Sequence, residues 1–131
     1  MDANKATSIS AGKAIYGVLS GNPVISASVT NIFPVAVDEA KLPYIVYKRI
    51  KGEYEPVKAG AGADASNVEV LCCAEDYDGA VDLAEGVNLL LNGRSGIFNG
   101  IRIRSCRYMD SDDFFEDDAY VVRIIFKVAI G

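Results

Sequence analysis

The sequence has no histidine and no tryptophan, and it has only three cysteines among its 131 residues. Without histidine, the chain lacks the usual general base of serine and cysteine nucleophile triads. The neighbours Cys72 and Cys73 point to opposite faces of a strand and cannot easily bridge, so the odd cysteine count favours free thiols in a reducing compartment. A zinc site is also disfavoured, because the chain has no C-x-x-C pair. We therefore expect a protein that is not an enzyme and has no cofactor.

Long apolar runs are also missing. The longest runs fall far short of the roughly 20 residues that cross a bilayer, and the opening residues "MDANKATSISAGK" lack the basic and apolar regions of a secretory signal. The length favours one domain, residues 1–131, and half of the residues are apolar, which supports a packed core. We expect a soluble chain that folds in a cytoplasm and does not enter a membrane.

Positive charge is not in excess. The formal net charge is −5, from 13 basic and 18 acidic residues, and six of the acids lie in "YMDSDDFFEDDAY", residues 108–120. Without that segment, 12 acids face 13 basic residues, a net charge of +1. No overall basic field is left to hold nucleic acid, so we expect no nucleic-acid binding.

The hydrophobic pattern predicts an α+β fold. We expect a mostly antiparallel β-sheet of four to five strands flanked by two helices, in the order α-β-β-β-α-β-β. The apolar positions recur at helical spacing from about Thr7 to Ser20, where Gly21-Asn22-Pro23 stops the first helix. They recur again after Asp76 or Asp78, where Asn92-Gly93 ends the second helix. Strands are expected at "NIFPV", where Pro34 favours an edge, and at residues 44–50, 67–75, 101–109 and 120–130. Residues 51–66 are predicted to be a long connection.

Residues 108–120 then fall between two alternating strands and are interpreted as a hairpin connection. Tested against a calcium loop that starts at Asp110, the segment places Asp110 and Asp112 correctly, but phenylalanines stand at positions 5 and 6. These two carboxylates remain weak candidates for a metal site. Carboxylate-pair catalysis is disfavoured, because acids crowded on a turn are well hydrated and repel one another.

The phenylalanine pair within this segment is costly in water at a loop tip. Phe114 and Phe115 are therefore expected to fold back on the sheet or to dock into a partner. The exposed strand positions Arg102, Arg104 and Arg123 are candidates to pair with acids of a neighbouring subunit. The high apolar content and the number of strand edges favour a self-assembling chain.

Several local motifs, in this order, resemble the small tail-completion proteins of long-tailed phages and prophages. A short first helix precedes "FPV", and "LPYIVY" at residues 42–47 follows. A long connection leads to "VEV" at residues 68–70, a helix with Ala80, Leu83, Ala84 and Leu90, and a strand pair whose connection is rich in aspartate. The likeness spans about residues 7–130.

This resemblance implies a structural role without catalytic residues. Members of known role form rings, commonly hexameric, that end tail-tube polymerisation or join tail to head. It therefore implies a homo-oligomer in the virion, assembled in the bacterial host cytoplasm, with the tail tube protein and a head-completion protein as partners. The alternative is a non-catalytic module that binds a divalent cation or another protein through the acidic segment.

Overall fold

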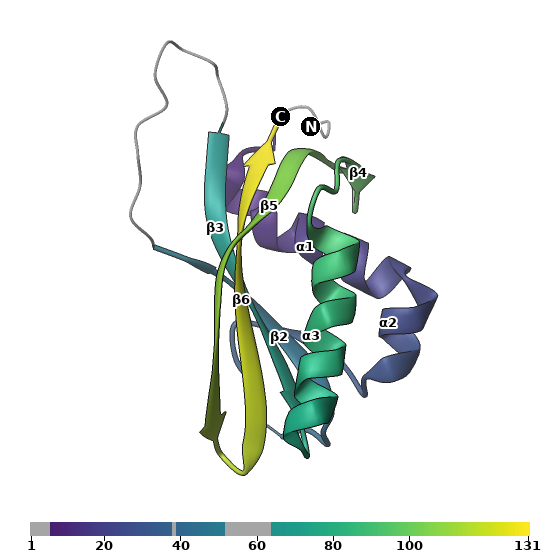
Figure 1. Ribbon diagram of the computed structural model, residues 1–131. Coiled ribbons are helices and arrows are strands. Elements are labelled where there is room, and N and C mark those ends of the chain that lie inside the picture. The colour runs from purple at the N-terminus through teal and green to yellow at the C-terminus, as the bar shows by residue number, and fades with distance from the viewer. Residues whose placement is uncertain (1–5, 38, 52–63) are drawn as a thin grey trace.

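A computed structural model describes residues 6–37, 39–51 and 64–131, and these fold into a six-stranded sheet with helices on one face (Figure 1). The strand order is β1-β2-β3-β6-β5-β4. The strands are β1 (Ile32–Pro34), β2 (Tyr44–Ile50), β3 (Asp64–Ala74), β4 (Gly96–Phe98), β5 (Ile101–Glu116) and β6 (Ala119–Ile130). The helical segments are η2 (Ser8–Ser10), α1 (Ala11–Gly21), α2 (Pro23–Ser28) and α3 (Tyr77–Leu91).

The two long helices form where the apolar stripes predicted them. In α1 the stripe Ala11, Ala14, Ile15, Val18 and Leu19 is buried. In α3 the Asp76 carboxylate accepts a hydrogen bond from the Gly79 N–H at 2.6 Å and caps the helix start. Both helices pack on one face of the sheet, where Val68, Phe126 and Ile103 lie in the fully buried core.

The α+β class is confirmed, but the predicted element order missed one strand and one helix. The sheet has six strands, and the β1–β2 pair is parallel, so the sheet is mixed. The short β4 was missed, although Asn99 and Gly100, both with positive φ, form the tight turn that joins it to β5. A third helix, α2, was also missed. Asn22 accepts hydrogen bonds from the Val24 and Ile25 N–H groups, and Pro23 occupies the first turn, so the expected stop signal also starts a helix.

The acidic segment is mostly a strand and not a connection, which corrects the prediction. β5 continues to Glu116, and only Asp117 and Asp118, both with positive φ, make the turn into β6. Aspartate has a low strand propensity, but that preference depends strongly on context. Here cross-strand pairing with β6 outweighs it, because the carboxylates reach water from a strand near the edge of the sheet.

The opposite face of the sheet has no helix in the part of the chain that the structure describes (Figure 1). Cys73, Ala119 and Val121 form a second, small buried cluster there. The edge strand β1 lies where Pro34 suggested, beside β2. Most of the predicted connection at residues 51–66 lies outside the described residues, and its last three residues begin β3. Among the described helices, none has the length and apolar character needed to span a membrane.

Candidate functional site

The tip of the β5–β6 hairpin carries an exposed aromatic cluster. The Phe115 and Tyr120 rings are 4.9 Å apart, and Tyr77 at the start of α3 lies 6.4 Å from Tyr120, with both contacts edge-on. Tyr77 donates a hydrogen bond from its hydroxyl to Asp113 Oδ2 at 2.7 Å, which raises the pKa of Tyr77. Phe115 remains 59% exposed. Three rings that pack edge-on and still face water form a surface suited to a protein contact.

The two phenylalanines separate because successive strand residues point to opposite faces. Phe115 joins the cluster of three rings, whereas Phe114 turns to the helix-free face and packs on the small core of Cys73 and Val121. The guanidinium carbon of Arg123 lies 5.6 Å from the centre of the Phe114 ring. Phe114 thus anchors the hairpin to its own sheet, and Phe115 is the ring left available to a partner.

Arg123 is already engaged within the chain. Its Nε and Nη2 groups donate to Asp112 Oδ1 and Oδ2 at 2.7 and 2.8 Å, and its Nη1 lies 3.8 Å from Glu69 Oε1. The hydrogen bond to Asp112 is the main reason that the pKa of Arg123 is raised. Asp112 and Arg123 are direct cross-strand partners, so this two-pronged pair fixes β5 against β6.

The weak metal candidates, Asp110 and Asp112, lie on the same strand face. Both oxygens of Asp112 accept hydrogen bonds from Arg123, and Asp110 Oδ1 accepts the Ser111 N–H at 2.8 Å. Within residues 6–37, 39–51 and 64–131, no three metal-ligating side chains gather. The arrangement holds Asp112 for an internal ion pair.

The opposite end of β5 is basic. Arg102, Arg104 and Arg107 are exposed there, and Lys127 of β6 pairs directly with Arg107. Among the described residues, every ion pair involves Arg123, so these four cations have no acidic partner there. One strand therefore carries positive charge at its start and negative charge from Asp110 to its end.

The outer edge of β5 is largely open over the described residues. The β4 strand covers only the register positions Ile101 to Ile103. Beyond them, Gly93 donates its N–H to the Cys106 carbonyl, and the Asn92 side chain accepts from the Tyr108 N–H. An open strand edge next to an exposed aromatic cluster is a place where another chain can bind.

The cysteines offer no nucleophile. Cys72, Cys73 and Cys106 are free and buried. Burial raises the pKa of Cys73 to about 11 and that of Cys106 to about 12, and it also raises the pKa of Cys72. Thiols in such surroundings stay protonated and unreactive.

Comparison with known proteins identifies this as a structural protein of phage tails. The chain belongs to the family of tail completion protein gp17, whose model matches residues 13–131. A chain of the solved "Virion of native gene transfer agent (GTA) particle" has the same fold, with a TM-score of 0.71 and 16% identity over 96% of this chain and 98% of that one. No curated protein sequence matches. The resemblance to tail-completion proteins is thus confirmed.

Sequence reasoning named Phe115, Arg102 and Arg104 as interface candidates but did not name Tyr77 and Tyr120, the other two members of the aromatic cluster. Tyr77 is 36 positions from its contact Asp113 in the sequence. Tyr120 is 5 positions from its contact Phe115. Tyr77 carried one usable signal, because it lies three residues before Ala80 and seven before Ala84 and so extends the apolar stripe of α3 to the first residue of the helix.

Proposed function

We propose that this chain forms a ring at one end of a phage tail tube, where it ends tube polymerisation or joins the tail to the head. Membership of the tail completion family supports this role. The observation that supports ring formation is that one chain has two unlike, complementary surfaces. The hairpin tip is aromatic and acidic, and the start of β5 is basic.

Unlike surfaces favour a heterologous contact, in which the tip of one copy meets the basic end of the next. Such contacts repeat around an axis and close into a ring when the rotation between copies permits it. Phe115 and the acids around it would meet Arg102 and Arg104 of the neighbour, and six copies are the number that the family resemblance suggests. Phe114 and Arg123 would hold the hairpin in position, because their own contacts lie within the chain.

In this role the chain would be part of the virion and would assemble in the bacterial cytoplasm. The tail tube protein and a head-completion protein are the proposed partners. A purely structural role agrees with the buried thiols, the absence of histidine and the lack of a metal cluster among the described residues.

Polymerisation of the tail tube protein with and without this chain tests the proposal. Negative-stain images should show shorter tubes with a ring of extra density at one end only. A variant with Phe115→Ala, which removes the exposed ring from the tip without changing its charge, should leave the tubes long and uncapped. Tubes of unchanged length and bare ends with the wild-type chain would sink the proposal.

A further inference from the structure

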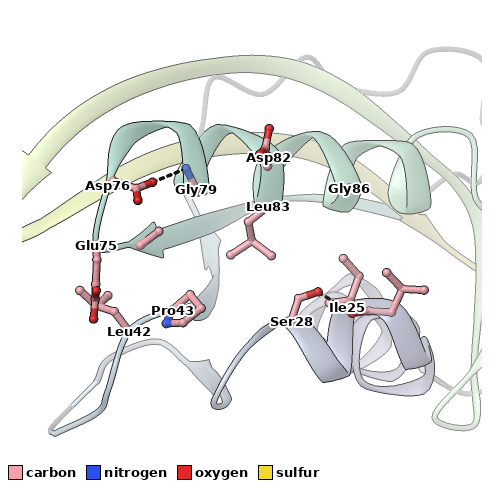
Figure 2. A pocket seen from close by; sticks show the side chains of 12 residues that line it. Ile25, Ser28, Leu42, Pro43, Glu75, Asp76, Gly79, Asp82, Leu83 and Gly86 are labelled. Carbon is pink, nitrogen blue, oxygen red and sulfur yellow. Dashed lines mark hydrogen bonds between the residues drawn. The ribbon is translucent and has the colours of Figure 1, made fainter.

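A groove lies between α2 and α3, next to the start of α3 (Figure 2). Its volume is about 470 Å³, within the range of sites that accept apolar groups. Ile25 of α2 and Leu83 of α3 point toward each other across it, and Leu42 and Pro43 close one end. The groove adjoins the aromatic cluster, because Tyr77 directly follows the rim residue Asp76.

Glycine keeps the α3 side of the groove open. Gly86 lies well inside α3, where glycine costs about 1 kcal/mol of helix propensity relative to alanine. Close packing does not require it, since an added Cβ would lie an ordinary 3.5 Å from Ile25 Cδ1. A larger side chain at this position would project into the space between the helices.

The rim of the groove is acidic. Glu75, Asp76 and Asp82 are exposed, and no lining residue is basic. The Ser28 hydroxyl donates to the carbonyl of Val24 in its own helix at 2.7 Å and is not offered to a ligand. Among the described residues, neither Glu75 nor Asp82 forms an ion pair. The groove therefore fits an apolar side chain that has a cation beside it.

The chain itself carries such a feature on its edge strand β4. Ile97 of β4 is 61% exposed, and its direct cross-strand partner is the exposed Arg102. β4 is one edge strand, whereas Leu42 and Pro43 of the groove lead into β2 beside the other edge. The groove is lined mainly by α2 and α3 and contains no residue of β4, so the two surfaces are separate and each is available to a different neighbouring copy.

We propose that the groove receives Ile97 of a second copy, with Arg102 of that copy against Glu75 and Asp76. This rests on the head-to-tail ring proposed above and names a second part of the same contact. The hairpin tip would contact Arg104 of the second copy, and the groove would bind Ile97 of that copy.

Cysteine cross-linking tests this pairing, since the three native thiols are buried and free. Copies carrying Gly86→Cys are mixed with copies carrying Ile97→Cys under mild oxidation. A disulfide-linked dimer of the two variants should form in the mixture, and neither variant alone should form one. Leu89→Cys is the matched control, because Leu89 lies on α3 outside the groove and is 85% exposed. Its mixture with Ile97→Cys should cross-link at least tenfold less.

A groove-filling variant gives a second readout. Gly86→Leu should weaken self-association at least tenfold, whereas Gly86→Ala should leave it within about twofold, and circular dichroism confirms that both fold. Rings that persist with Gly86→Leu and without the cross-link would overturn the groove inference and leave the ring standing. If rings persist with Gly86→Leu and no cross-link forms, but the variant no longer caps tubes, the groove binds another virion protein. That outcome would also overturn the groove inference. Absence of any oligomer, in wild type too, would count against the ring itself.

Discussion

One substitution, glycine to alanine, is expected to have opposite effects on stability at two helix-interior positions. At Gly86 an added methyl group meets only Ile25 Cδ1 at 3.5 Å. At Gly17 of α1 it would lie 2.9 Å from Asn99 Cβ, 3.0 Å from the Asn99 nitrogen and 3.2 Å from the Phe98 carbonyl carbon. The first position has room for the methyl group, and the second is closed by backbone atoms that cannot move aside cheaply.

The magnitudes follow from helix propensity and overpacking. Gly86→Ala gains about 0.5–1 kcal/mol, because alanine is the better helix former. Gly17→Ala has the same gain, but overpacking of this kind costs about 1–3 kcal/mol. We expect a net loss of roughly 1–2 kcal/mol there. At roughly 4 °C per kcal/mol for a chain of this size, Tm should rise by about 2–4 °C in the first variant and fall by about 4–8 °C in the second.

Thermal and urea unfolding followed by circular dichroism measure both changes. The two variants act as controls for each other, because the chemistry of the substitution is the same. A stabilising Gly17→Ala would refute the close approach of α1 to the turn between β4 and β5. Destabilisation by Gly86→Ala would mean that the groove is already filled at that position in the isolated chain.

Three further outcomes are expected. A double-mutant cycle with Arg123→Ala and Asp112→Ala should give a coupling energy of about 0.5–1 kcal/mol in urea unfolding. The coupling energy should fall in 1 M salt, because both side chains are partly exposed. A coupling energy of zero at low salt would contradict the two-pronged pair. Millimolar calcium should leave Tm unchanged. A rise in Tm of several degrees that Asp110→Asn abolishes would support a calcium site in the acidic segment. The raised thiol pKa values predict that the free energy of unfolding falls from about pH 9, where the thiols of the unfolded chain ionise. The fall continues to about pH 11–12, where Cys73 and Cys106 ionise in the folded chain. Urea unfolding measured from pH 8 to 11 should show a smaller fall for Cys106→Ala than for the wild type.

The periodic elements were predictable from sequence because their apolar faces decide their structure. β2 was placed at the observed residues 44–50, and in the predicted strand at 67–75 the alternating residues Val68, Val70 and Cys72 are buried in the core. The α3 stripe and its end near Asn92 are also confirmed. Each of these segments buries one face against the core, so its pattern is unambiguous.

The errors have local physical causes. Asn22-Pro23 was interpreted only as a stop, although an Asn cap followed by proline is also a start signal. Asn99-Gly100 was overlooked as the turn of a short hairpin. The acidic run was read from composition, but the strand is fixed by the pairing of Asp112 with Arg123 and of Phe114 with Val121.

The candidate site was only partly accessible from sequence. The exposed arginines followed from strand alternation, and the unusual position of the phenylalanine pair pointed to the hairpin. The separation of Phe114 from Phe115 became visible only once the acidic run was known to be a strand. The groove between α2 and α3 depends on a helix that was not predicted, so no sequence pattern indicated it.

The head-to-tail contact is tested most directly by mixing two variants, each with one damaged surface. Phe115→Ala removes the exposed ring of the tip surface, and Arg102→Glu with Arg104→Glu removes the basic surface. Native mass spectrometry should find rings for the wild type, monomers for each variant alone, and dimers of one copy of each in the equimolar mixture, because only one intact contact can then form. Full rings from either variant alone, or a mixture that stays monomeric while the wild type forms rings, would contradict the account.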